Sequence, residues 1–436
     1  MTCSIPVNTS CFVLSAILSV ALASCGDAEK PASKVDTAKS LIQRVVDPQV
    51  PVADSTTLSS DNAAFAFDVY QRLILEHSNL IFSPASISIA LAMTYAGAAG
   101  TTATEMAQTL HFTLPPERLH PAFNAMDQAL ASRGQGQPGS DDKPMRLKIV
   151  NALWAEKTYP FRSDFLDALA ANYGAGVNLL DFLNSTDPSR LTINAWVAGQ
   201  TENKTQDLLP QGSVKSDTKL VLTNAVYFNA AWKNPFDQDN TRDGLFTLLD
   251  GGSITAKFMN TDSFDLPAMR GTNLVAASLP YADDRLSLVV VVPDAGQFSQ
   301  VESSLDASAL GTLVAGLTGQ QVLLSLPRFK VETGTSLKDL LMALGMTSAF
   351  TWGPADFSGM DGTQDLYIGD VIHKAFINVG EKGTEAAAAT AVVMKNGAAL
   401  PSGLLINADR PFLYFLRDQP TGAILFMGRV LDPSKN

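Results

Sequence analysis

The sequence predicts a domain of the α+β class, and three observations lead to that prediction. The chain has 436 residues, of which 46% are hydrophobic and 17% charged, so it can bury a large core. Helix-like and strand-like patterns alternate irregularly, without the regular rhythm of a parallel α/β sheet. No internal repeat or low-complexity block interrupts them. We therefore expect one large domain.

An export signal is expected before that domain. The cysteines Cys3, Cys11 and Cys25 all lie at the N-terminus, so the domain itself has no disulfide or thiolate metal site. Residues 12–24, FVLSAILSVALAS, form an apolar run of the length of a signal-peptide core. The run ends in Leu-Ala-Ser-Cys, which resembles the lipobox of bacterial lipoproteins. We predict a signal over residues 1–25 with Cys25 lipidated.

A second interpretation of the N-terminus stays open. The residues before the apolar run lack the usual lysine or arginine, so an ordinary cleaved secretory signal with an incidental cysteine is the alternative. Both interpretations predict export to the cell envelope or the extracellular space, with membrane contact only through a lipid. Residues 26–59, rich in Ala, Asp, Lys, Ser, Thr and Pro, predict a flexible linker. The folded domain is expected over residues 60–436.

The first elements of the domain read as helices. Residues 61–75, DNAAFAFDVYQRLIL, place Phe65, Val69 and Leu73 four apart behind an aspartate cap, which predicts an amphipathic helix. Residues 83–100 predict a second, more apolar helix closed by glycines.

Strand patterns and a loop follow. Residues 131–144, ASRGQGQPGSDDKP, are typical of a surface loop. Residues 220–232, LVLTNAVYFNAAW, are apolar at odd and even positions, which predicts a central strand covered on both faces. Residues 285–296, RLSLVVVVPDAG, predict another such strand, ending in a turn.

Charge and motif content exclude several classes of function. A net charge of −12 without a Lys/Arg cluster argues against nucleic acid or a heparin-type polyanion as partner. No GxSxG elbow or HExxH motif is present, so we expect no metal, no cofactor and no enzyme activity. Lys382-Gly383-Thr384 lacks the order and leading glycine of a phosphate loop. Adjacent acidic pairs such as Asp141-Asp142 and Asp283-Asp284 are interpreted as solvated charge.

The segment 383–393, GTEAAAATAVV, carries one charge and mostly methyl-sized side chains. Alanine content favours a helix. In a strand, however, Thr384, Ala386, Ala388 and Thr390 would share one face, because alternate side chains point to opposite sides. Every position on that face is small and uncharged, so the segment is also suited to enter a sheet.

Several ordered motifs resemble the serpin family, over roughly residues 60–434. They are NLIFSPASISIALAM (79–93), INAWVAGQTENKTQDLLP (193–210), LTNAVYFNAAWKNPFD (222–237), ADFSGM (355–360), VIHKAFINVGEKGTEAAAATAVV (371–393), and ADRPFLYFLRD followed by ILFMGRVLDP (408–433). The resemblance implies a serpin fold with three β-sheets, about nine helices and an exposed reactive-centre loop. It also implies a monomeric suicide-substrate inhibitor of serine proteases, whose cleaved loop inserts into the central sheet.

The resemblance assigns roles to residues one by one. The reactive-loop hinge comprises Gly383, Thr384, Glu385, Ala386, Ala387, Ala388, Ala389 and Thr390. The shutter, a polar cluster under strands that part to admit the loop, comprises Ser83, Ser86, Asn224 and His373. The breach, where the loop first enters, comprises Trp232, Arg328 and Glu381. The family commonly has lysine at the Arg328 position, a change that keeps the charge.

The scissile bond is placed by the family's spacing of fourteen residues beyond Gly383, which gives Gly397-Ala398. A small residue at the cut favours elastase-like or subtilisin-like proteases. Cleavage after Lys395 would suit a trypsin-like enzyme but leaves a shorter insert, and Pro401 disfavours cleavage after Leu400. Two other functions stay open: a cross-class inhibitor of papain-like cysteine proteases, and a non-inhibitory serpin acting as carrier, chaperone or structural protein.

Overall fold

The computed structural model describes residues 35–75, 78–261, 263–385 and 403–435. Within these ranges the chain forms ten α-helices and two short 3-10 helices, close to the nine or so helices expected. The α-helices are α1 (Val52–Leu73), α2 (Pro84–Tyr95), α3 (Gly100–Thr109), α4 (Pro116–Ala131), α5 (Ser163–Tyr173), α6 (Thr186–Gln200), α7 (Phe298–Ser304), α8 (Ala307–Gly316), α9 (Lys338–Ala343) and α10 (Ser358–Asp361). The 3-10 helices are Gln238–Asn240 and Ser348–Phe350.

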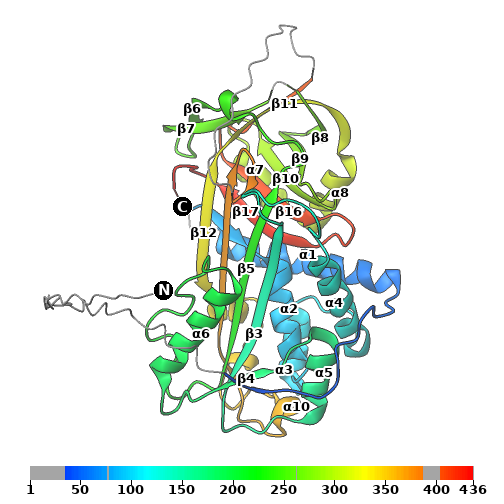
Figure 1. Cartoon of the computed structure of the whole chain (residues 1–436), viewed down its shortest axis with the longest axis vertical. Helices are drawn as coiled ribbons and strands as arrows, with labels where there is room; N and C mark the ends of the chain where they lie inside the picture. Colours follow the sequence, from blue (N-terminus) through cyan, green and yellow to red (C-terminus); the bar gives the residue numbers. More distant parts are fainter. Residues whose placement is uncertain (1–34, 76–77, 262, 386–402, 436) are drawn as a thin grey trace, which may run out of the picture. The chain divides into compact units, whose positions relative to one another are not determined.

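A seven-stranded sheet runs through the middle of the domain (Figure 1). Its strands, in spatial order, are β1 (Asp36–Ala38), β4 (Val177–Leu180), β3 (Arg146–Glu156), β5 (Leu220–Ala231), β14 (Gly383–Thr384), β13 (Ile368–Gly380) and β12 (Phe329–Ser336). β5 is antiparallel to β3 and parallel to β13. Every residue of β5 except Ala231 is buried, which confirms the central strand predicted there.

The other described strands form one ten-stranded network. They are β2 (Leu80–Phe82), β17 (Ile424–Val430), β16 (Phe412–Asp418), β10 (Leu286–Pro293), β9 (Leu274–Pro280), β8 (Phe264–Gly271), β11 (Thr318–Pro327), β7 (Ser253–Asn260), β6 (Arg242–Thr247) and β15 (Leu404–Asn407). The described strands therefore make two hydrogen-bonded networks where three sheets were expected. The reason is that β11 pairs with β8 along its first half and with β7 at its end, joining two sheets through one strand. All of β10 is buried, as predicted.

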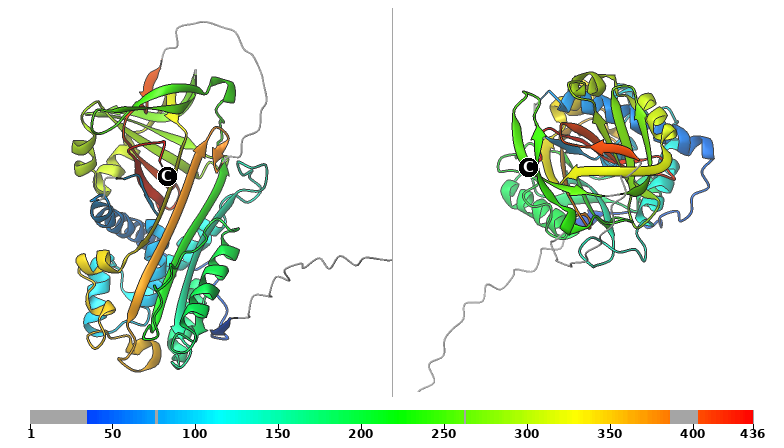
Figure 2. Two further views of the ribbon diagram at one scale, coloured as in Figure 1. Left: turned by 90° about the vertical axis from the view of Figure 1, so that its left-hand side faces the viewer. Right: turned by 90° about the horizontal axis from the view of Figure 1, so that it is seen from above.

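Helices cover both faces of the central sheet. α6 lies on one face (Figure 2, left). Its Val197 belongs to a buried apolar cluster that includes Trp154 of β3 and Ala225 of β5. α2 lies on the other face and contacts β3 and β5. This two-sided cover explains why β5 is apolar at successive positions, since a strand between two helical layers has no solvent face.

The expected linker is wrong for the part of it that the structure describes. Residues Asp36–Ala38 pair with β4 at the edge of the central sheet. Arg44 donates to Asn124 and forms an ion pair with Asp127, both on α4. α1 begins at Val52, so the compact domain starts well before residue 60. Polar composition suggested a linker, but these polar groups are bonded to the domain surface.

The predicted cap of the first helix is also wrong. Asp61 lies inside α1, and its carboxylate accepts hydrogen bonds from the backbone N–H and the hydroxyl of Thr113. The second predicted helix is confirmed as α2, which ends at Tyr95, before the glycines. Residues 131–144 connect α4 to β3 as expected of a loop, but Ser140 within it is buried. The hydroxyl of that serine bonds the backbone of Thr384 and Glu385.

Candidate functional site

The first two residues assigned to the hinge lie inside the central sheet. Gly383 and Thr384 form β14, which pairs antiparallel with β13 on one side and with β5 on the other. Only glycine fits at 383: its φ is +151°, and an added Cβ would lie 2.0 Å from the carbonyl oxygen of Ala230. Below this point β5 and β13 pair directly with each other. A short strand thus occupies the upper end of the seam between them.

Thr384 points into the core. Its side chain is buried, and its hydroxyl lies 2.6 Å from the hydroxyl oxygen of Tyr281. The Tyr281 ring stacks on Trp232 with centroids 4.4 Å apart. Burial raises the pKa of Tyr281, so its hydroxyl stays protonated and can donate to Thr384 or accept from it. A small hydroxyl side chain is therefore specifically accommodated here.

The three residues assigned to the breach meet at the same end of the sheet. Arg328 Nε donates to Glu381 Oε1 at 2.7 Å, and Thr241 donates to the same oxygen at 2.6 Å. Trp232 Nε1 donates to the carbonyl oxygen of Gly380 at 2.9 Å. The Glu381 side chain is only 8% exposed, and these donors offset the cost of burying it. They fix the backbone just before β14.

The four residues assigned to the shutter also lie together, lower in the seam. His373 Nδ1 bonds Asn224 Oδ1, and its Nε2 accepts from the backbone N–H of Ser83 at 3.1 Å. Asn224 Nδ2 donates to Ser86 and to Asn151 Oδ1. Ser83 contributes its backbone, since its buried hydroxyl has no partner among the described residues. Burial lowers the pKa of His373 to about 3, so the ring is neutral with its proton on Nδ1.

Asn151 is part of this cluster, although sequence reasoning did not single it out. Asn151, Asn224 and His373 lie in register across β3, β5 and β13. The only sequence signal is an amide within the apolar stretch 149–155 of β3. The result is a row of side-chain hydrogen bonds that crosses the seam between β5 and β13, which must break if another strand is to enter.

The hinge has further contacts that the sequence did not indicate. Ser140 donates to the carbonyl oxygens of Thr384 and Glu385, each at 2.7 Å. Asn229 donates to the Glu385 carbonyl, and Lys204 pairs with the Glu385 carboxylate. The remaining predicted residues lie outside the described ranges: Cys25, Ala386, Ala387, Ala388, Ala389, Thr390, Gly397 and Ala398.

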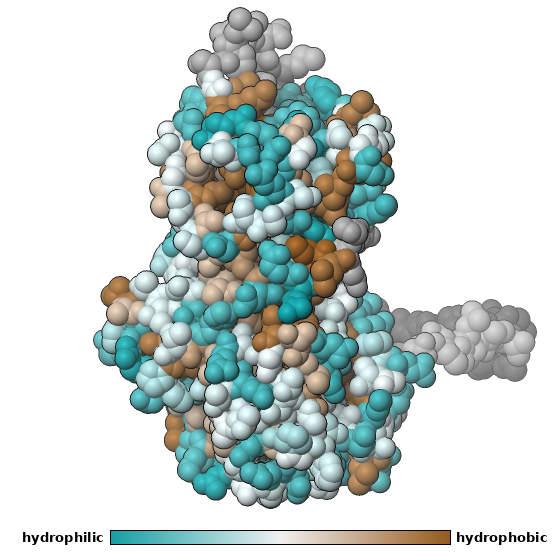
Figure 3. Space-filling model, turned by 180° about the vertical axis from the view of Figure 1, so that it is seen from behind, coloured by the Kyte–Doolittle hydropathy of each residue, from teal (hydrophilic) through white to brown (hydrophobic). Residues whose placement is uncertain are grey.

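Neither a metal-binding cluster nor a membrane-spanning helix is found in the described part of the chain. No group of three or more His, Cys, Asp or Glu residues within the described ranges could hold a metal ion. None of the helices described is long and apolar enough to cross a membrane. On the face opposite Figure 1, apolar residues form separate patches among polar ones (Figure 3).

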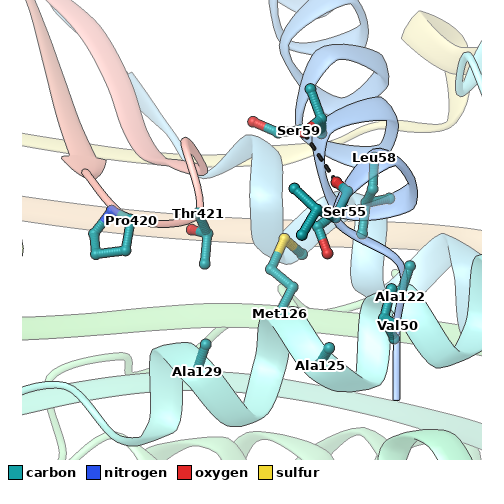
Figure 4. Close-up of a pocket in the computed structure, with 12 residues that line it drawn as sticks. Val50, Ser55, Leu58, Ser59, Ala122, Ala125, Met126, Ala129, Pro420 and Thr421 are labelled. Atoms are coloured by element: carbon teal, nitrogen blue, oxygen red, sulfur yellow. Dashed lines mark hydrogen bonds between the residues drawn. The ribbon is translucent and has the colours of Figure 1, made fainter. Parts of the chain in front are cut away.

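A cleft of about 370 Å³ opens between α1, α4 and the turn from β16 to β17 (Figure 4). Its walls include Leu58, Met126 and Ala129, and Ser55, Ser59 and Thr421 add hydroxyl groups. Among the described residues that line the cleft, none has an ionisable side chain. Its chemistry fits an apolar group and offers no acid or base.

Comparison with known proteins gives one consistent family. A family model described as "Serpin (serine protease inhibitor)" matches residues 60–433. Leukocyte elastase inhibitor of Homo sapiens is 37% identical over 386 residues, which cover 86% of this chain and 99% of that protein. An uncharacterized serpin-like protein of Thermococcus kodakarensis is 36% identical over 372 residues, covering 85% of this chain and 84% of its own.

Solved structures agree. The thermophilic serpin Tengpin in its native state has a TM-score of 0.79 at 27% identity, covering 92% of this chain and 100% of its own. Human thyroxine-binding globulin in complex with thyroxine has a TM-score of 0.77 at 30% identity, covering 88% and 100%.

Proposed function

This chain belongs to the serpin family, and from that premise we propose that it is a suicide-substrate inhibitor of serine endopeptidases. The protease serine oxygen attacks the carbonyl carbon of Gly397, and the bond to Ala398 breaks. The new amine of Ala398 takes the proton, and Gly397 stays joined to the protease as an ester. Gly383 and Thr384 of the reactive loop (383–397) already form β14, and the rest of the freed loop then follows them into the seam between β5 and β13 and carries the protease with it.

The observation that carries this proposal is β14 itself. It supplies the antiparallel register along which a longer strand can continue on both sides. Each residue further along the loop moves its partner one residue back along β5. Ten more residues, 385–394, would bring Met394 opposite Leu220, where β5 begins. Eleven would bring Lys395 opposite Ile368, where β13 begins.

This register supports the proposed scissile bond. Gly397 would lie just beyond the ends of both neighbouring strands, so the protease attached to it would be held at the far edge of the sheet. Cleavage after Lys395 would leave the ester at the last paired position, where the sheet edge would obstruct the protease. Residues 385–397 contain no proline, so each can donate its backbone N–H to a ladder.

Insertion is also favourable in energy. Seven paired positions between β5 and β13 would be exchanged for two antiparallel ladders around the new strand. The net gain is about ten hydrogen bonds, on the order of 10 kcal/mol at about 1 kcal/mol each. That rivals the stability of about 5–15 kcal/mol of an ordinary domain, enough to distort an attached protease.

The buried polar clusters fit two stages of this process. Arg328, Glu381 and Trp232 hold the entry point beside Gly380. Asn224 and His373 tie β5 to β13 across the seam and act as a gate, because their hydrogen bond must part before the loop passes. Neither cluster is proposed to take part in bond breaking.

The target proposed is an elastase-like or subtilisin-like serine protease, because a Gly-Ala bond fits a small primary pocket. The similarity to leukocyte elastase inhibitors supports this class. A trypsin-like enzyme cutting after Lys395 and a papain-like cysteine protease are the alternatives to include in the assay.

A non-inhibitory carrier is the second candidate. Thyroxine-binding globulin, a structural neighbour, is seen with thyroxine bound. The cleft beside Leu58 and Met126 (Figure 4) offers a partly apolar site in this chain. The small, uncharged residues at 386–390 favour the inhibitor.

We also propose that the protein is exported and acts as a monomer, with Cys25 as the lipid attachment point. Metabolic labelling with a fatty acid tests the anchor: the label should be lost in Cys25→Ser. Export without labelling would instead indicate a cleaved secretory signal. Light scattering of the soluble domain tests the monomer.

The experiment for the main proposal is to incubate residues 35–436 with elastase-like, subtilisin-like, trypsin-like and papain-like proteases. A band of summed mass that survives denaturant, with a released peptide starting at Ala398, is expected for a serine protease. Cleavage in the loop without that band, and without a rise in thermal stability, would instead favour the carrier. A papain-like enzyme in the band would indicate cross-class inhibition.

A further inference from the structure

Glu385 directly follows the short strand β14 and is the last described residue before position 386. The residue before it, Thr384, is fully paired in β14. Glu385 still receives a pairing bond, because its backbone N–H donates to the carbonyl oxygen of Asn378. Its φ of +64°, however, is in the left-handed region, which a residue with a side chain rarely adopts. A strand cannot continue through this conformation.

Side chains from two separate segments hold the carbonyl of Glu385 in this conformation. Ser140, in the loop between α4 and β3, donates to the carbonyl oxygens of Thr384 and Glu385 at 2.7 Å each. Asn229 of β5 donates to the Glu385 carbonyl at 3.2 Å and accepts from the backbone N–H of Ser140 at 2.9 Å. Ser140 and Asn229 are both 1% exposed, so these bonds are sheltered from water.

A third segment holds the side chain of the same residue. Lys204, which follows α6, forms an ion pair with the Glu385 carboxylate. The glutamate side chain is 10% exposed and the lysine side chain 45% exposed. Asn229 lies 3.5 Å from the second carboxylate oxygen. Backbone and side chain of Glu385 are thus both bound.

We infer that Ser140, Asn229 and Lys204 are positioning residues that set how far the uncleaved loop enters the sheet, an inference that rests on the proposed function. For the strand to extend, residue 385 must change to an extended φ of about −140°. That rotation moves its carbonyl away from Ser140. The contacts therefore stabilise the partly inserted state selectively, and only such a difference can shift an equilibrium between two states.

The consequence concerns the uncleaved protein. If the contacts of Ser140, Asn229 and Lys204 with Glu385 are weakened, the strand can extend without cleavage, and the protein converts to an inserted, inactive form. One lost hydrogen bond should accelerate this conversion about five- to tenfold. These contacts would also oppose the proposed trapping reaction, because residue 385 must leave the conformation that they stabilise before the loop can insert.

The test uses Ser140→Ala and Lys204→Met in residues 35–436. Each uncleaved variant is held at elevated temperature, and conversion to a more heat-stable form is followed by native gel and thermal unfolding. Both variants should convert at least fivefold faster than the unchanged protein. Lys204→Arg and Ser140→Thr should restore the original rate. Lys157→Met, which removes a comparably exposed ion pair with Asp181 far from the hinge, is the matched control.

The outcomes separate this inference from the proposed function. Equal rates in all proteins, including no conversion of any, would overturn the inference even if covalent complexes form with a protease. Faster conversion of Lys157→Met by the same factor would overturn it too, since general destabilisation would then explain the result. Failure to trap any protease would refute the proposed function, while the conversion rates would still measure the effect of these contacts on Glu385.

Discussion

Replacement of Thr384 by arginine tests the proposed insertion most directly. Thr384 is 1% exposed and sits between Ala230 and Val379 in the ladder, with its hydroxyl against Tyr281. An arginine side chain is far larger and carries a charge, and among the described residues Tyr281 is the one polar side chain that bonds the Thr384 hydroxyl. The variant hinge would be expelled from the sheet or would have to bury an ill-paired guanidinium.

The magnitude follows from that burial. An unpaired buried charge costs at least several kcal/mol, and we take about 4 kcal/mol after relaxation. If this cost is felt in the transition state for insertion, the rate falls by about a thousandfold, since about 1.4 kcal/mol corresponds to a factor of ten. Hydrolysis of the ester would then be faster than insertion. The variant should be cleaved and released as a substrate.

The assay is titration of a protease that the unchanged protein traps, with gel detection of the covalent complex and of the cleaved product. Thr384→Arg should give cleaved product and no complex. Thr384→Ser keeps the hydroxyl and small size and should trap normally, and Thr384→Val should lose little. Unchanged stoichiometry of trapping by Thr384→Arg would refute insertion of this face of the loop.

Three further predictions concern stability. Arg328→Ala leaves the buried Glu381 carboxylate without its guanidinium and should lower the free energy of unfolding by about 1–3 kcal/mol, measured by denaturant titration. Arg328→Lys should recover most of this loss. An equal loss in both variants would contradict the ion-pair explanation. Burial lowers the pKa of His373 to about 3 and of His120 to about 4. Both histidine rings stay neutral in the folded protein, but below about pH 6.5 they gain a proton in the unfolded chain. Stability should therefore fall from pH 7 to pH 5 by about 2 kcal/mol per histidine; a flat profile would contradict neutral burial. A chain starting at residue 60 lacks β1 and the first turns of α1, including buried residues, and should be about 3 kcal/mol less stable than one starting at residue 35; equal denaturation midpoints would show that the N-terminal segment contributes nothing.

Local patterns predicted several elements correctly. The apolar run of β5 was correctly interpreted as a strand covered on both faces, because burial on two sides removes the alternation of polar residues. The apolar helix α2 was predicted for a similar reason. The start of α1 was missed, since Val52 to Ser60 is polar enough to resemble a linker and its packing depends on α4. Composition cannot distinguish a polar segment in solvent from one bonded to a neighbouring helix.

The sequence by itself predicted the family, and it predicted that Arg328 meets Glu381 and that Asn224 meets His373, as the structure shows. It could do so because ordered motifs and small side chains can be identified directly in the linear sequence. Only the tertiary structure decided that Thr384 already lies in the sheet and that Ser140 and Lys204 hold Glu385 at its edge. Ser140 and Glu385 are 245 residues apart, and a contact at that separation exists only once the whole fold has brought a surface loop against the seam.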